Sequence, residues 1–393
     1  MHLDIAARKG ISSFAALLAV GAVGCGSTGD FAAQRDDGGA LGADGAAAAS
    51  DGGGQNTATS DAGTSDTGTH DGDGGDGGDP PVVCTVRVPA DYPGVGEAVT
   101  ALLLTGGTIC VTSMPTNGSS GALTAVPLGT PPLTIVGYGR GANANHLGIS
   151  VKDYAPGLFL RNIALAGLSI ESSVVEIRGS SVHGDYAGAI VVNDTAGSTH
   201  AVIDGCDIST GLKQFASAGV EGAIVVYPGP HAVATEFLRV QNSYIHDTGY
   251  GLYYYEPSLS TVGGNFVFVN NTLANNLEGI ELSPRYDTGG TLRFANNLFV
   301  GNATGARLVG TATNTLRILP NNNLYFGNTA SFSGAFPPGS PFFTGDPKLD
   351  TSVPPRPTAG SATIGQADPA FAPTSDFLGR ARGAAPDIGA VQH

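Results

Sequence analysis

The chain has no tryptophan, only four cysteines, and 18 lysines and arginines against 33 aspartates and glutamates. A net charge of −15 argues against a nucleic-acid partner, because such partners require a basic surface. The spacings typical of zinc sites, serine-hydrolase elbows, phosphate loops and dinucleotide-binding folds are also missing. We therefore expect no metal and no cofactor. The length of 393 residues allows one sizeable domain with tails.

The amino terminus has the pattern of an export signal. Arg8 and Lys9 precede an apolar stretch over residues 11–23, and small residues follow in AVGCGS. A charged region, a short apolar region and small residues predict a signal peptide over residues 1–24. The apolar stretch is too short and small-sided for a stable membrane span.

The residues around Cys25 resemble the lipobox of bacterial lipoproteins, in which the cysteine is acylated and becomes the first mature residue. The resemblance implies that Cys25 anchors the protein to a membrane through acyl chains. Gly26, in place of Asp, implies sorting to the outer membrane or cell surface. Ordinary cleavage nearby would instead leave Cys25 as an incidental thiol.

Residues 25–81 consist almost entirely of Gly, Ala, Ser, Thr and Asp. This composition cannot offset the entropy of ordering, so we predict a disordered tether. Eleven aspartates against Arg35 give residues 26–80 a charge of −10. The run DGDGGDGGD suggests calcium, but a helix-loop-helix calcium site needs Glu at its twelfth position, where Val82 stands. The pattern favours a solvated linker.

The folded domain is predicted to begin with a cap and first coil over residues 82–130. VVCTVRV and TICV alternate like strands, and an amphipathic segment between them ends before Gly106. The apolar residues on one side of this segment are Val95, Ala98, Val99, Leu102 and Leu103. Cys84 and Cys110 lie on the flanking strands and are candidate disulfide partners, because exported proteins form disulfides.

Internal repeats fill the next part of the chain, residues 131–340. Seven segments align without gaps: LFLRNIAL, VEIRGSSV, AVIDGCDI, LRVQNSYI, VFVNNTLA, LRFANNLF and ILPNNNLY. Their fifth positions are Asn162, Gly179, Gly205, Asn242, Asn271, Asn296 and Asn322. Apolar residues two and four positions earlier should stack inside, including Val267 and Val269.

The asparagine column predicts a fold of stacked coils. Asparagine at a repeated corner can hydrogen-bond along the stack, and both asparagine and glycine tolerate a left-handed backbone. Later segments such as EGAIVV, YGLYYY and EGIEL add another strand to each coil. An antiparallel sandwich would show hairpin turns and no shared corner. We therefore predict an all-β solenoid.

These repeats resemble the right-handed parallel β-helix, or pectate-lyase-like, superfamily, and VRVPADYPGVGEAVTAL resembles its amino-terminal cap. The closing segment over residues 341–393 resembles that of exported bacterial β-helix proteins, whose pattern ends in Asp-Ile-Gly-Ala, an apolar residue and Glu. Residues 387–391 match this pattern, and Gln392 replaces the acid. The resemblance covers residues 82–393 and implies a fold, without a catalytic signature. The three aspartates typical of polygalacturonases are missing.

One outward strip carries Arg178 beside Asp204 on neighbouring coils. In polysaccharide lyases of this superfamily, a basic residue removes a proton next to a uronate carboxylate. The resemblance makes Arg178 and Asp204 candidate catalytic residues. A salt bridge between neighbouring coils on a solvent-exposed face explains the same pair. No flanking lysine or acidic calcium cluster in the sequence supports catalysis.

A second outward strip is rich in tyrosine and carboxylates. The predicted substrate-binding residues are Tyr253, Tyr255, Glu256, Glu281 and Arg285, and the candidate catalytic acids are Glu256, Glu278 and Glu281. Tyrosine rings stack on sugars, and two acids at suitable spacing could cleave a glycosidic bond. Stacking of aromatic side chains between coils is the alternative explanation.

Two histidines, His183 and His246, occupy equivalent positions two coils apart, too far apart for one metal. Histidines bonded to the turn backbone are expected, and Asp247 should face away from His246.

These features together predict an envelope-anchored, monomeric lipoprotein that binds polysaccharide or another envelope polymer. A polysaccharide lyase or glycoside hydrolase is the alternative, and a structural or adhesive surface protein is a further one.

Overall fold

The computed structural model describes residues 82–112, 121–124, 131–137, 147–154, 156–184, 188–194, 196–211, 222–231, 235–255, 264–284, 290–309 and 317–393. The predicted signal peptide, Cys25 and the tether lie outside these residues. No helix in the described ranges is long and apolar enough to span a bilayer.

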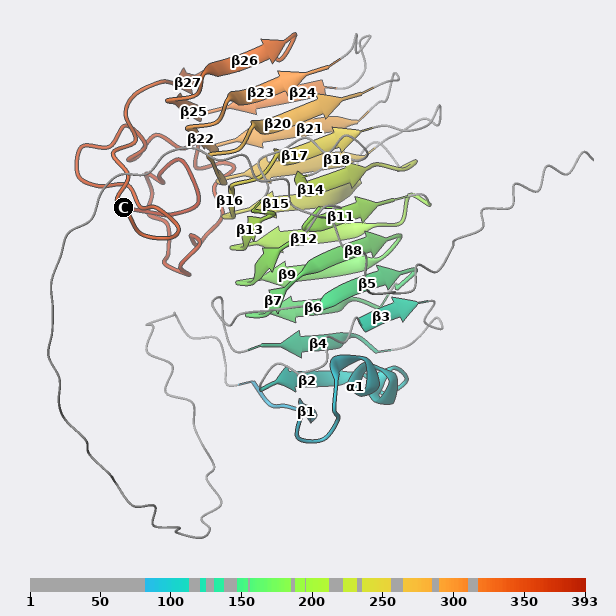
Figure 1. Ribbon diagram of the computed structural model, residues 1–393. Helices are drawn as coiled ribbons and strands as arrows, with labels where there is room; N and C mark the ends of the chain where they lie inside the picture. The colour runs from blue at the N-terminus through green and yellow to red at the C-terminus, as the bar shows by residue number, and fades with distance from the viewer. Residues whose placement is uncertain are drawn as a thin grey trace, which may run out of the picture. The chain divides into compact units, whose positions relative to one another are not determined.

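Three parallel sheets build the fold, with each coil contributing strands to successive sheets (Figure 1). Sheet A contains β1 (Val86–Val88), β2 (Gly107–Val111), β4 (Leu133–Val136), β6 (Leu158–Arg161), β9 (Val174–Arg178), β12 (His200–Asp204), β15 (Glu236–Gln241), β18 (Asn265–Val269), β21 (Thr291–Ala295) and β24 (Arg317–Asn321). Sheet B contains β3 (Gly121–Thr124), β5 (Gly148–Lys152), β8 (Gly167–Glu171), β11 (Ile190–Asn193), β14 (Gly222–Tyr227), β17 (Tyr250–Tyr255), β20 (Glu278–Ser283), β23 (Thr304–Leu308) and β26 (Ala330–Gly334).

Sheet C contains β7 (Ala164–Leu165), β10 (Ser181–His183), β13 (Asp207–Ser209), β16 (Tyr244–His246), β19 (Thr272–Ala274), β22 (Leu298–Val300), β25 (Asn323–Phe326) and β27 (Phe342–Phe343). Every strand pairs in parallel with its counterpart one coil away, as in the pairing of β12 with β9 and β15. This arrangement is a parallel β-solenoid, so the predicted fold class is confirmed.

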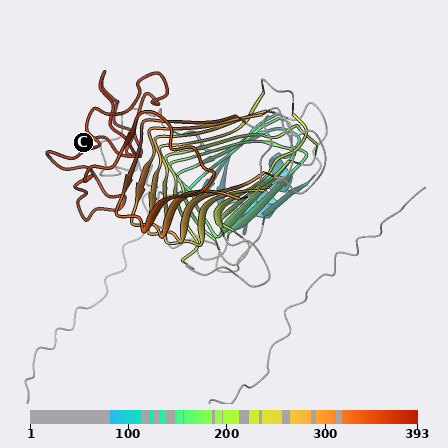
Figure 2. The ribbon, with the colours of Figure 1, turned by 90° about the horizontal axis from the view of Figure 1, so that it is seen from above.

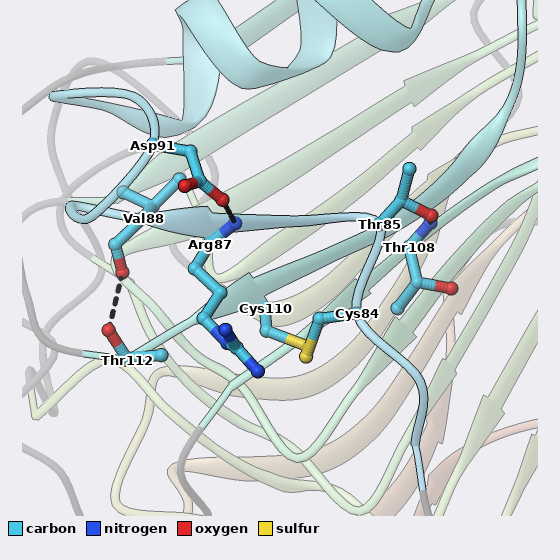
Figure 3. Close-up of a disulfide and its surroundings, with 8 residues drawn as sticks. All are labelled: Cys84, Thr85, Arg87, Val88, Asp91, Thr108, Cys110 and Thr112. Atoms are coloured by element: carbon cyan, nitrogen blue, oxygen red, sulfur yellow. Dashed lines mark hydrogen bonds between the residues drawn. A yellow bond between two sulfur atoms is a disulfide. The ribbon is translucent and has the colours of Figure 1, made fainter. Parts of the chain in front are cut away.

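The first coil is closed by a helix and a disulfide. Helix α1 (Val95–Leu102) buries the apolar side that the sequence predicts, and it lies at the end of the stack beside β1 and β2 (Figure 1). Cys84 and Cys110 form a disulfide with a Cα–Cα distance of 5.6 Å (Figure 3). Beside this disulfide, the backbone N–H of Thr108 donates to the Thr85 hydroxyl at 3.0 Å. The first two strands are therefore joined covalently and by hydrogen bonds.

The interior column of sheet A differs from the predicted one in a single coil. Phe266 and Phe268, not Val267 and Val269, fill the interior, because β18 pairs with β15 through Phe268 opposite Val240. A shift of one residue moves a whole strand to the other face, and the larger phenylalanine rings take the core. Val267 and Val269 lie on the outside, where Phe371 packs against them.

The corner between sheets A and C has one left-handed residue in each coil. Its members are Asn162, Gly179, Gly205, Asn242, Asn270, Asn296 and Asn322, with φ between 49° and 60°. Asn270 therefore replaces Asn271 in the predicted column. The other six members agree with the alignment, because asparagine and glycine are the residues that adopt this conformation at little cost.

The residue after each of the last three corners is an asparagine that points inward, and these three residues form a ladder. The backbone N–H groups of Asn271 and Asn297 each donate to the side-chain oxygen of the asparagine one coil further on, both at 2.9 Å. The Asn297 amide nitrogen also donates to the Phe268 carbonyl at 2.9 Å. Asn271, Asn297 and Asn323 are fully buried. A second ladder runs through Asn276, Asn302 and Asn328 at the next corner. The ladders thus satisfy backbone groups that the corners leave unpaired.

The closing segment folds back along the first corner, outside the coils (Figures 1 and 2). The Asn270 amide donates to the Asp387 carbonyl at 3.0 Å, and the Gly389 N–H donates to the Asn296 carbonyl at 2.8 Å. Ile388 is fully buried against Leu298 and its neighbours. The side-chain oxygen of Gln392 accepts the Asp387 N–H at 3.1 Å, so the amide serves as an acceptor at this position.

Replacing Asn297 by alanine should lower the free energy of unfolding by about 3 kcal/mol, because two buried backbone groups lose their partners. Urea unfolding of the full chain followed by circular dichroism measures this loss. Asn193→Ala is the matched control, since the half-buried Asn193 side chain makes no hydrogen bond within the described ranges. An equal decrease in both variants would contradict a special role for the ladder.

Candidate functional site

The aromatic strip lies on the outer face of sheet B. Tyr253 and Tyr255 point outward with their rings stacked at 5.8 Å between centroids, while Tyr254 points into the core against Phe266. The Tyr227 ring meets Tyr255 edge-on at 6.1 Å. Tyr253 is only 9% exposed and Tyr255 is half-buried. Tyr255 is therefore the ring of this stack that can contact a ligand, with Tyr253 supporting it from behind.

Two glutamates and an arginine continue this face onto the next strands. Tyr253, Glu281 and Arg307 are neighbours in register across β17, β20 and β23. An Arg307 nitrogen lies 2.8 Å from a Glu278 carboxylate oxygen and 3.6 Å from one of Glu281. The Arg307 side chain is 41% exposed, whereas those of Glu278 and Glu281 are 7% and 8% exposed. The exposed part of this cluster is thus cationic, with both acids beneath it.

Glu278 reaches the outer face because the strand is irregular at Gly279. Strict alternation would send Glu278 inward together with Ile280, yet its carboxylate pairs with Arg307 outside. A side chain at Gly279 would place its Cβ 2.4 Å from the Gly305 carbonyl oxygen. Only glycine permits this close approach of neighbouring strands.

The Glu281 carboxyl keeps its proton up to near neutral pH. Burial raises the pKa of Glu281 to about 7, helped by its hydrogen bond to Glu278 and by the charge of that group, while Arg307 opposes the shift. The second oxygen of Glu278 is buried, and no N–H or hydroxyl group of the described residues donates to it. Burial and both glutamates also raise the pKa of Tyr250.

The positions of Glu278 and Glu281 can be compared with those of the two catalytic acids in a glycosidase. A retaining or inverting glycosidase holds its acids roughly 5 to 9 Å apart so that they flank the scissile bond. Glu278 and Glu281 both contact the same Arg307 nitrogen, at 2.8 and 3.6 Å, so a guanidinium group already lies beside both acids. The pair can hold or release a proton, and Arg307 can bind a negatively charged group.

Arg178 and Asp204 are adjacent in register, but Arg178 is already engaged. Its Nε lies 2.6 Å from a Glu176 oxygen and 4.0 Å from an Asp204 oxygen. Asp204 also accepts a hydrogen bond from the Asn242 amide at 3.0 Å. The Arg178 side chain is 51% exposed, so the arrangement is a solvated ladder of charges.

His183 and His246 bond to side chains. The sequence had instead suggested bonds to the turn backbone, and that expectation is wrong. His183 Nδ1 lies 2.8 Å from the Ser209 hydroxyl. His246 lies between Asp207 and Asp247, at 2.9 and 2.8 Å. Asp247 faces His246 because its φ of 51° turns the chain at this corner. Burial lowers the pKa of His246, but the two aspartates outweigh it and raise the pKa above its usual value.

The structure adds Tyr227 to the predicted tyrosine face on sheet B. Two other residues that were predicted for this face are not described by the structure. Glu256 and Arg285 lie outside the described ranges. Tyr227 follows AIVV on β14, one strand before Tyr255. Aligning the later strands by their glycines was the signal that could have found Tyr227. That alignment is displaced by one residue, because Gly222 pairs with Tyr250 and not with Gly251.

The raised pKa of Glu281 predicts a pH-dependent stability. The folded protein keeps a proton that the unfolded chain, with the ordinary carboxyl pKa of 4.5, releases. Stability should therefore fall as the pH rises from about 4.5 to about 7, by up to about 3 kcal/mol. Glu281→Gln should flatten this fall, because the amide still donates to Glu278. Urea unfolding midpoints at pH 5 and pH 8 test this expectation. Glu97→Gln, at an exposed position of helix α1, is the control. A variant with the wild-type pH profile would contradict the assignment.

Comparison with known proteins supports the fold but does not identify an activity. A family model described as "Right handed beta helix region" matches residues 159–323. No curated protein matches the sequence. The matched residues begin on β6 and end on β25, and they include the asparagine corner and Tyr255. The match and the three parallel sheets together support a parallel β-helix superfamily for this chain.

Proposed function

We propose that this protein is an envelope-anchored lipoprotein whose β-helix binds polysaccharide or another cell-envelope polymer on the outer face of sheet B. The observation that carries the proposal is the tyrosine stack ending in half-buried Tyr255, beside partly exposed Arg307. Aromatic rings pack on the apolar faces of sugars, and guanidinium groups bind hydroxyls and carboxylates. The outer face of sheet B continues along the parallel coils on both sides of this surface, which suits a polymer longer than one coil.

Replacing Tyr255 by alanine should weaken retention on the polysaccharide that binds best by about tenfold, because the contacting ring is lost. Tyr253→Ala should weaken it less, since that ring supports Tyr255. A glycan array probed with the full chain measures both. Phe342→Ala, an aromatic ring 44% exposed on β27, is the control and should bind as the wild type does. Absence of binding to any glycan would leave the structural or adhesive surface protein as the better explanation.

A second candidate, a polysaccharide lyase or glycoside hydrolase, is favoured by one observation. The pKa of Glu281 is raised to about 7, and a carboxyl that titrates near neutrality can act as a general acid or base. Assays for unsaturated uronates and for reducing ends test this candidate. Products that disappear in Glu281→Ala but persist in Arg178→Ala would assign catalysis to sheet B, and the reverse result would assign it to the charge ladder on sheet A.

Anchoring through Cys25 is proposed on the lipobox-like sequence alone. Cys25→Ser should abolish incorporation of labelled palmitate and release the protein from the membrane fraction, because the thiol that carries the acyl chain is missing. The buried Cys206→Ser variant is the control. Equal labelling of the Cys25→Ser variant would contradict the lipid anchor and favour ordinary signal cleavage.

A further inference from the structure

A groove of about 540 Å³ lies on a different face, between the outer side of sheet A and the closing segment. Its floor comes from successive strands β15, β18, β21 and β24, and its wall from residues 370–373. Val267 and Leu319 are apolar floor residues, and Phe371 is the aromatic part of the wall. The volume is within the range of about 300 to 1,000 Å³ typical of ligand pockets.

Arginines dominate the charge of this groove. Arg239, Arg293 and Arg317 line it against a single carboxylate, Glu236. Arg239 donates two hydrogen bonds, of 2.6 and 2.7 Å, to the Glu236 carboxylate and so neutralises it. Neither Arg293 nor Arg317 forms an ion pair within the described ranges, and the Arg293 guanidinium carbon lies 4.3 Å above the Phe371 ring. The groove is therefore positive in a chain whose net charge is −15.

The nearest carboxylate of the closing segment does not neutralise these arginines. Asp368 accepts hydrogen bonds from the Asn321 amide at 2.8 Å and from the Ala370 N–H at 2.9 Å, and it is not part of the lining. Arg293 and Arg317 lie on the adjacent strands β21 and β24, where Arg317 pairs with Thr291 and Arg293 pairs with Leu319. The two arginines are therefore diagonal neighbours, roughly 7 to 8 Å apart along the backbone. Their guanidinium groups remain available to two neighbouring oxyanions.

We propose that this groove binds an acidic oligosaccharide, with its carboxylate or sulfate groups on Arg293 and Arg317 and its apolar ring carbons against Phe371 and Leu319. An inorganic anion would use the arginines alone and leave the apolar floor and the aromatic wall without a function. A neutral sugar would leave two cations unpaired. The proposal deepens the proposed function, on which it rests, by naming the charge of the polymer and a second contact face.

The binding of galacturonic acid trisaccharide to the full chain, measured by calorimetry, tests this assignment. Arg293→Gln and Arg317→Gln should each weaken binding by about tenfold, and the double variant should lose measurable binding, because each removes a charge-assisted contact. Arg87→Gln, an exposed arginine on β1 of the same sheet, is the control and should bind as the wild type does. Raising the salt concentration should weaken wild-type binding.

Three further probes decide the nature of the ligand. The methyl-ester trisaccharide should bind at least tenfold more weakly, and a sulfated trisaccharide should bind if oxyanion charge is what matters. Phe371→Ala should weaken both acidic sugars but not inorganic sulfate. Equal binding of acid and ester, or unchanged binding in the double arginine variant, would overturn the proposal. If the acidic sugar is lost in Tyr255→Ala and kept in the double variant, the ligand lies on sheet B, and the proposed function stands without this groove.

Discussion

The structure depends on one left-handed residue at the corner between sheets A and C in every coil. This conformation turns the chain within two residues, so that a strand of sheet A is followed at once by one of sheet C. Most residues adopt it only with strain, and the corner is therefore occupied by asparagine or glycine from Asn162 to Asn322. Because the corners stack, the strands on either side stay in register and the aliphatic and aromatic side chains fill one continuous interior.

The asparagine pairs at these corners perform two separate tasks. The second asparagine of a pair, such as Asn297, points inward and bonds along the ladder. The first, such as Asn296, points outward and holds the closing segment through Asp368 and Gly389. The closing segment in turn supplies Phe371 to the arginine groove. The corner chemistry therefore determines both the interior and one of the two candidate binding faces.

The sequence predicted the repeats, the cap helix and most of the corner column, because periodicity and residues with special backbone preferences are local signals. It misplaced the strand before Asn270, since VFVNN offers two asparagines and the alignment chose the second. It placed Tyr253, Tyr255 and Glu281 on one face, but it did not predict that Glu278 also reaches this face at Arg307, where it helps to raise the pKa of Glu281. The arginine groove could not be predicted, because Phe371 meets Arg293 across 78 positions of chain with no repeat pattern.

The two ends of the stack are held by different chemistry. The asparagine rows run through the later coils, whereas serine or cysteine takes the equivalent inward place earlier, as Ser180 and Cys206 do. The earliest strands are instead fastened by the bond between Cys84 and Cys110. A reductant acts on sulfur and leaves amides untouched. Exposure to thiols would thus loosen the amino-terminal end of the stack first, while the tyrosine face and the arginine groove, several coils away, kept their shape.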